Sequence, residues 1–131
     1  MTVSLESIAN LKQMAIDVNG PGTANRLFII VGTAVFTLTP PGNEKIVVDD
    51  LVFDIGPTLF PGQFRDATAT ASLASISNED TAIDALWAVD SVLADFNAAT
   101  RRVRITARLV VRDSDGFLNR LGLQVNILAA L

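Results

Sequence analysis

A strict alternation of apolar and other side chains between Arg102 and Arg112 is the feature that most limits what this chain can fold into. One set of alternate positions is entirely apolar: Val103, Ile105, Ala107, Leu109 and Val111. The intervening positions carry four arginines together with Thr106 and Val110. Successive side chains of a strand point to opposite faces, whereas a helix would spread these residues around its circumference. The segment therefore predicts a strand with one buried face.

A second alternating segment follows the sequence Asp113-Ser114-Asp115-Gly116. If Asp113 pairs with Phe117, Gly116 takes the loop position that needs a positive φ. In that register four apolar pairs coincide: Leu109 with Leu121, Ala107 with Leu123, Ile105 with Val125, and Val103 with Ile127. We therefore predict an antiparallel hairpin in which Asp113, Asp115 and Gly116 form a structural turn. The predicted core residues are Ile105, Leu109, Leu121, Leu123 and Val125.

Turn residues divide the rest of the chain into further expected strands, at 13–18, 26–39, 45–55 and 64–77. Residues 82–96 fit either a helix that starts after Ser77 or a strand that ends in a hairpin. The strand is favoured by its valines and Trp87, but loops of four and five residues would place opposite faces inward. Helical spacing of Leu5, Ile8 and Leu11 allows a short N-terminal helix.

About seven strands without βαβ alternation predict an all-β fold, an antiparallel β-sandwich, with a closed β-barrel as the alternative. The 131 residues correspond to a single domain, 1–131. A chain of this length buries enough surface to fold without a metal or a disulfide.

Three residue types are missing: the chain contains no cysteine, no histidine and no tyrosine. Disulfides and thiolate chemistry are excluded, and so are the commonest general base and the commonest transition-metal ligand. No Gly-x-Ser-x-Gly, Ser-x-x-Lys or P-loop motif occurs. We therefore expect no enzyme activity, no catalytic residue, no cofactor and no metal.

The net charge is −4, with 10 basic and 14 acidic residues. Affinity for a phosphate backbone needs a basic surface, so nucleic-acid binding is not expected. The N-terminal residues lack the pattern of a signal peptide, and the apolar run 27–38 is too short for a membrane-spanning helix. We expect no membrane insertion and, by default, a cytoplasmic location.

Two acidic groups are candidates for chemistry. Asp113-Ser114-Asp115-Gly116 resembles the opening of a calcium loop, but its glycine comes two residues early and loop position 12 is Gln124. Asp49, Asp50 and Asp54 could form a paired carboxylate site of the kind that hydrolases use. On one strand Asp50 and Asp54 share a face and Asp49 lies opposite, so solvated carboxylates are the simpler interpretation.

The polar face of the 102–112 strand and the aromatic residues offer further candidates. The arginines are expected to pair across strands with Asp90 and Asp95. Trp87 is expected in the core, whereas Phe60, Phe64 and Phe117 lie near turns and could be exposed. This leaves a ligand-binding module for a sugar, a lipid or a peptide as an alternative function.

The leading functional hypothesis is a non-enzymatic structural module that forms a homo-oligomer. A mean hydropathy of +0.41 with only 18% charged residues leaves few polar residues to cover the surface, and subunit interfaces absorb such apolar area. The 26–39 segment is apolar at both parities, although a two-layer sandwich buries only one face of each strand. The predicted interface therefore contains Ile29, Val31 and Val35, or their opposite-parity neighbours Phe28, Ile30 and Phe36.

Overall fold

The computed structural model describes residues 2–20, 23–38, 46–78, 86–112 and 116–131, which are almost entirely β-strand. The strands are β1 (Thr2–Val3), β2 (Ser7–Gly20), β3 (Thr23–Leu38), β4 (Ile46–Ile55), β5 (Phe64–Asn78), β6 (Leu86–Asn97), β7 (Arg102–Arg112) and β8 (Gly116–Ala130). One turn of 3-10 helix, η1 (Pro61–Gln63), precedes β5.

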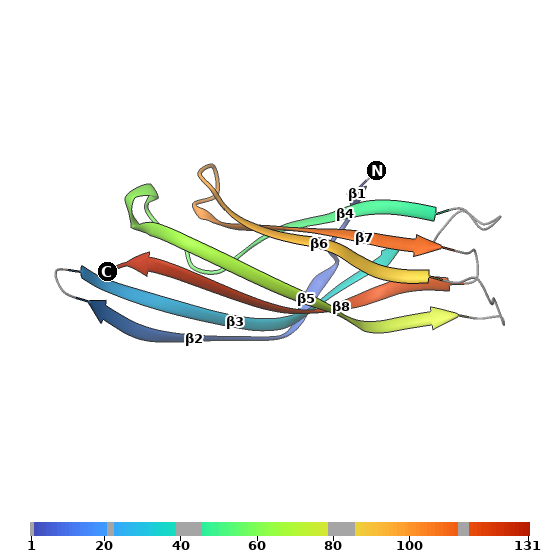
Figure 1. Ribbon diagram of the computed structural model, residues 1–131, viewed down its shortest axis with the longest axis horizontal. Helices are drawn as coiled ribbons and strands as arrows, with labels where there is room; N and C mark the ends of the chain where they lie inside the picture. The colour runs from blue at the N-terminus through green and yellow to red at the C-terminus, as the bar shows by residue number, and fades with distance from the viewer. Residues whose placement is uncertain (1, 21–22, 39–45, 79–85, 113–115) are drawn as a thin grey trace.

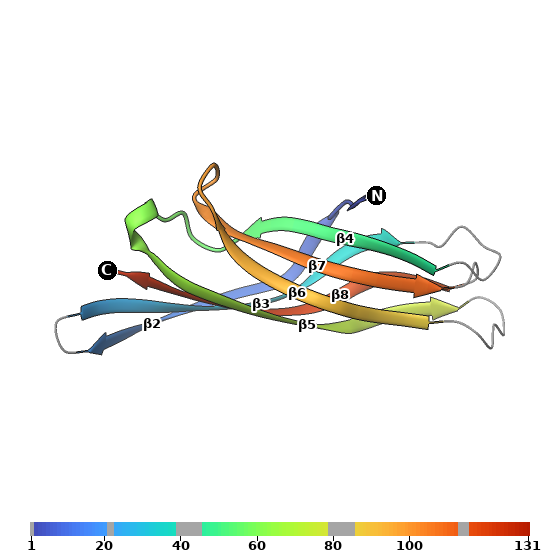
Figure 2. The ribbon, with the colours of Figure 1, turned by 45° about the horizontal axis from the view of Figure 1, so that its top comes forward.

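The strands form two sheets that lie face to face as a sandwich (Figures 1 and 2). Sheet A has the order β1-β4-β7-β6, and sheet B has the order β2-β3-β8-β5. Neighbouring strands are antiparallel except for the short parallel pair β1–β4. The predicted β-sandwich is confirmed, and neither sheet closes into the alternative barrel within the described ranges.

The core lies between the two inner faces, where each inner face is the side of a sheet that points toward the other sheet. In β7 every second residue from Val103 to Val111 is buried, and in β8 the same holds from Leu121 to Ala129. The five predicted core residues are all among them. Full burial of an aliphatic side chain of this size contributes about 1.5–3 kcal/mol, so this alternation accounts for much of what holds the sheets together.

The predicted hairpin between β7 and β8 is wrong. β7 pairs with β4 and β6 in sheet A, whereas β8 pairs with β3 and β5 in sheet B. Their apolar faces meet across the core rather than side by side in one sheet, which satisfies the same alternation. Asp113 and Asp115 of the predicted turn lie outside the described residues, and Gly116 begins β8 opposite Asn78.

The strand interpretation of residues 82–96 is confirmed for β6, and its register is now defined. Asn97 pairs with Arg102, which leaves a loop of four residues. The N–H of Arg101, whose φ is +58°, donates to the carbonyl oxygen of Asn97 at 2.7 Å. The register shifts once, between Val89 and Ser91, so no single alternation describes the whole strand.

The short N-terminal helix does not form. Ile8 and Leu11 belong to β2, which begins at Ser7, and no α-helix occurs in the described part of the chain. The segment pairs with β3 on both sides of an irregularity in β2. This irregularity shifts the phase of the side chains, so the spacing of Leu5, Ile8 and Leu11 does not indicate a helix.

Candidate assembly surface

The irregularity in β2 is a β-bulge at residues 10–11. The register jumps from Ala9, opposite Thr33, to Lys12, opposite Val31, so two residues of β2 face one residue of β3. Asn10 has a φ of +53°, a left-handed conformation that asparagine tolerates better than most residues. A bulge inverts the side-chain phase of the strand that contains it. The segment after the bulge therefore has its own alternation.

We call Lys12–Gly20 of β2, together with the paired residues 23–31 of β3, the β2–β3 arm. Directly paired residues of neighbouring strands share a face of the sheet. Met14 pairs with Ile29, Ile16 with Leu27 and Lys12 with Val31, so these side chains lie on one face. Ile30 points the other way and is buried in the core. The face with Met14 and Ile16 is therefore the outer face of sheet B.

The outer face of the arm is apolar and exposed. Met14 is 61% exposed, Ile16 50%, Val18 44% and Val31 38%, while Leu27 and Ile29 are half-buried beside them. On β8 the outer face continues with Leu128 opposite Leu27, and then becomes polar at Asn126 and Gln124. Contiguous apolar surface of this kind on a folded protein marks an interaction site.

Along β2 the inner face of the arm is mostly polar instead. The residues of β2 on this side are Gln13, Ala15, Asp17 and Asn19, all of them exposed. Asp17 accepts a hydrogen bond from Nε of Arg26 at 2.9 Å. Along β2 the arm thus has the reverse of the polarity that the rest of the sandwich has, because the apolar side of this strand faces away from the other sheet.

The position of the arm explains this reversal. Its end, with the C-terminal end of β8 beside it, reaches past the ends of β4, β6 and β7 (Figures 1 and 2). Sheet A therefore does not cover the inner face at the end of the arm, and polar side chains are stable there in contact with water. The folding of a single chain does not bury the exposed apolar side chains on the outer face of the arm.

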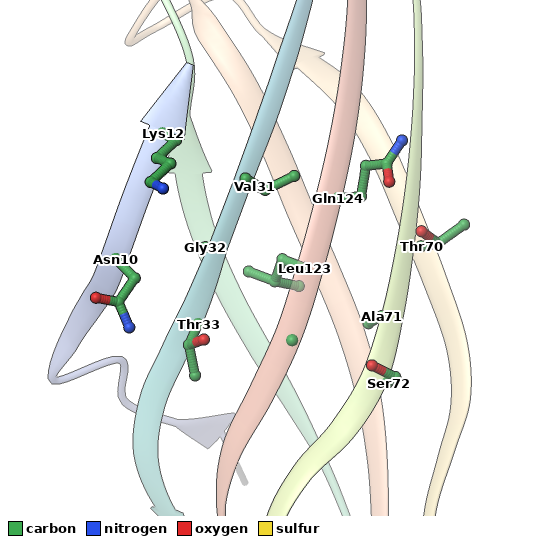
Figure 3. A pocket seen from close by; sticks show the side chains of 11 residues that line it. Asn10, Lys12, Val31, Gly32, Thr33, Thr70, Ala71, Ser72, Leu123 and Gln124 are labelled. Atoms are coloured by element: carbon green, nitrogen blue, oxygen red, sulfur yellow. The ribbon is translucent and has the colours of Figure 1, made fainter. Parts of the chain in front are cut away.

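An open groove of about 550 Å³ adjoins the arm on the outer face of sheet B. Lys12 lies at one side and Thr70 and Ser72 of β5 lie at the other, with β3 and β8 between them (Figure 3). Over β8 the floor of the groove includes Gly122, which has no side chain to fill it; a Cβ there would lie 3.2 Å from Oγ of Ser72. Its polar lining consists of hydroxyl, amide and ammonium groups.

The structure separates the six predicted interface residues by parity. Ile30 and Phe36 are buried in the core, and Phe28 packs against it. Ile29, Val31 and Val35 lie on the outer face, where Val35 is half-buried opposite Arg120. The sequence prediction did not include Met14, Ile16 and Val18, although their alternation with Gln13, Ala15 and Asp17 was the signal that identifies them.

The three candidate carboxylates do not form one site. Asp49 is buried on the inner face of β4, whereas Asp50 and Asp54 are on its outer face, as the strand pattern predicted. Asp50 lies 3.4 Å from Nε of Arg108, and Asp54 lies 2.9 Å from Nε of Arg104. The expected partners of the arginines were Asp90 and Asp95 of β6, and this part of the prediction is corrected, because Arg104 and Arg108 pair with carboxylates of β4 instead. General acids need a raised pKa, whereas the hydrogen bond from Arg104 lowers the pKa of Asp54.

Asp54 is the most strongly held of these groups. Its Oδ2 accepts hydrogen bonds from Oγ1 of Thr100 at 2.9 Å and from Nδ2 of Asn97 at 3.1 Å. The hydrogen bond from Arg104 holds the pKa of Asp54 below its ordinary value of 3.8, against the opposing effect of burial. The ionised carboxylate of Asp54 therefore connects the β6–β7 loop to β4.

The aromatic candidates differ in their exposure to solvent. Phe60 is exposed, with the guanidinium carbon of Arg101 5.5 Å from its ring centre. Phe64 is half-buried and stacks on Phe96 with ring centres 5.1 Å apart. The side chains of Trp87 and Phe117 lie outside the described residues. In the ranges that the structure covers, no group of three acidic side chains gathers as metal ligands would.

The fold and this surface define a β-sandwich with a projecting apolar arm. No family model, curated protein or solved structure matches the chain. No helix within the described ranges combines the length and the apolar character needed to cross a membrane.

Proposed function

We propose that the protein is a non-enzymatic assembly module that packs against further copies of itself through the outer face of the β2–β3 arm. The observation that carries the proposal is the apolar row Met14, Ile16 and Val18, exposed on the side of sheet B that faces away from the core. A second copy that places the same face against it removes both rows from water. Sheets packed face to face are the ordinary way in which such surfaces are buried.

The surface area of the chain supports the same proposal. A compact monomer of 13.9 kDa exposes about 6,700 Å². This chain exposes 7290 Å², an excess of about 600 Å² over that expectation. A stable interface of standard size buries about 800 Å² on each partner. The excess is therefore close to what one subunit contact removes.

Sedimentation at tens of micromolar tests the proposal. We expect the wild type to sediment as an oligomer, and Val31→Asp to lower its mass while the far-ultraviolet circular dichroism stays that of a β-protein. Leu93→Asp is the matched control, because Leu93 is an exposed strand residue on the outer face of sheet A. A wild type that sediments at 13.9 kDa overturns the proposal.

A second candidate function is the binding of a sugar or peptide in the groove beside the arm. The observation that favours it is the row of hydrogen-bonding groups from Lys12, Thr70, Ser72 and Gln124. Screening the wild type on glycan and peptide arrays tests it, with Ser72→Val as the variant that removes one hydroxyl from the groove. Binding that Ser72→Val leaves unchanged places the ligand elsewhere.

A further inference from the structure

The free edge of β2 offers a second contact, separate from the outer face. β2 is at the end of sheet B and pairs with β3 along one side, and no described strand pairs with its other side. Between the bulge and the end of the strand, nine residues, Lys12–Gly20, run without a register shift. An uncovered edge of this length presents a row of backbone groups that can extend the sheet. It contains no proline that would prevent such pairing.

We propose that β2 of a second copy pairs antiparallel with this edge, so that Ile16 lies opposite Ile16 of the second copy and the two sheets B become one continuous sheet. Ile16 is the central residue of the nine, so every residue of the segment then has a partner. Two identical strands paired in this way are related by a two-fold axis perpendicular to the sheet, the commonest symmetry of homo-oligomers.

The side chains agree with this register. Residues at equal distances from Ile16 face each other, which places Met14 opposite Val18 on the outer face and Gln13 opposite Asn19 on the inner face. Apolar pairs and hydrogen-bonding pairs opposite one another are what stabilise neighbouring strands. All three exposed apolar residues of the strand acquire an apolar partner.

The charges agree as well. Lys12 would lie opposite Gly20, and Asp17 would lie opposite Ala15, so no two like charges face each other. Asp17 is already neutralised by its hydrogen bond from Arg26. Sliding the second strand by two residues would pair Lys12 with Val18, which leaves an apolar side chain opposite an ammonium group. The β2 residues on the inner face of the arm are all exposed, so sheet A of the same chain does not obstruct the second copy.

The edge contact rests on the arm, as the proposed face contact does, but uses its backbone rather than its outer face. Pairing at the edge places two apolar outer faces side by side on the same surface. A two-fold axis perpendicular to the sheet and a two-fold axis within the interface of stacked faces generate a closed assembly of four copies when the two axes intersect at right angles. The inference is therefore that β2 edges join chains in pairs, and that outer faces join the pairs.

Cysteine cross-linking tests the register directly, because the chain has no cysteine of its own. In Gln13→Cys/Asn19→Cys the two thiols of one chain are about 20 Å apart along the strand, too far for an internal disulfide. Edge pairing brings each of them next to the other thiol of the second copy. We expect mild oxidation to link the double variant into dimers, and each single variant to stay largely unlinked. Leu93→Cys is the control for random collision at an exposed strand residue.

Four outcomes separate this inference from the proposed function. Tetramers that Val31→Asp reduces to cross-linkable dimers support both contacts. A wild-type dimer without the double-cysteine link overturns the edge contact and leaves the face contact in place. A linked dimer that Val31→Asp leaves intact supports the edge and overturns the face contact. An unlinked monomer overturns both.

Discussion

Ile30 and Val31 are successive residues of β3 in opposite environments: Ile30 is 1% exposed in the core, and Val31 is 38% exposed on the outer face of sheet B. Both are β-branched and apolar, so composition cannot distinguish them. The inner face of β3 contributes to the stability of one chain. Its outer face has an apolar neighbourhood that one chain does not bury.

The same charge at these two positions should therefore have different effects. Ile30→Asp places a carboxylate in the core without a partner, at a cost of several kcal/mol, enough to unfold a domain of this size. Val31→Asp should change the free energy of unfolding of the monomer by less than about 1 kcal/mol. Urea unfolding at low protein concentration, where subunit contacts are absent, measures both. Equal losses at the two positions contradict the assigned parity.

The pairing of Asp54 with Arg104 predicts a dependence of stability on acid. The pKa of Asp54 is lower in the folded protein than in the unfolded chain, so the unfolded state binds the proton more readily. The stabilisation is present above the ordinary pKa of 3.8 and is lost as the pH falls through the lowered value. Between about pH 5 and pH 2, the melting temperature of the wild type should fall more steeply than that of Asp54→Asn.

Asp66→Asn is the control for Asp54→Asn, because it removes a carboxylate from sheet B instead of sheet A. Identical acid profiles for the wild type and Asp54→Asn would mean that the Arg104 contact has no effect on stability in solution.

Gly56→Ala should destabilise the fold by roughly 1–3 kcal/mol. Gly56 follows β4 with a φ of +92°, and a Cβ there would lie 2.6 Å from Cδ1 of Ile127. Backbone strain and a clash with a core residue thus act together. Gly62→Ala is the matched control, since a Cβ at Gly62 has no neighbour within 4 Å. Thermal melts of the two variants that coincide would contradict the conformation assigned to Gly56.

Leu109→Ala should cost roughly 2–5 kcal/mol, because it removes a fully buried side chain and leaves a cavity between the sheets. Leu93→Ala makes the same chemical change at an exposed position of the neighbouring strand β6, and should cost less than about 0.5 kcal/mol. Chemical denaturation gives both values. A loss below about 0.5 kcal/mol at Leu109 would mean that β7 does not face the core.

The alternation in the sequence was sufficient to place β7 and β8 and to choose their buried faces, but it assigned them to the wrong sheets. Leu109 and Leu121 were correctly placed in the core and incorrectly paired. Periodicity describes one strand at a time, so it indicates which side is buried and not which strand is adjacent. The sequence Asp113-Ser114-Asp115-Gly116 is compatible with a hairpin and with a crossover between sheets.

The same limit explains the candidate surface. The sequence indicated that β3 is apolar on both sides, and the three-dimensional fold was needed to show that Val31 is on the uncovered side. The alternation of β2 after the bulge was visible in the sequence, but alternation alone does not show whether the side of Met14 faces the other sheet or water. The partners of Arg104 and Arg108 depended on β4, which is distant in sequence and whose pairing no local pattern specifies.

The position of β8 has a consequence for how the chain reaches this structure. β8 follows the other described strands in the sequence, yet it lies between β3 and β5 in sheet B and provides hydrogen-bonding partners to both. During synthesis on the ribosome, β3 and β5 therefore lack their shared neighbour until the residues of β8 are translated. Contacts between distant parts of a chain slow folding and prolong the time that strand edges stay open to other molecules. A nascent chain of this protein should thus require protection from aggregation until β8 has been translated.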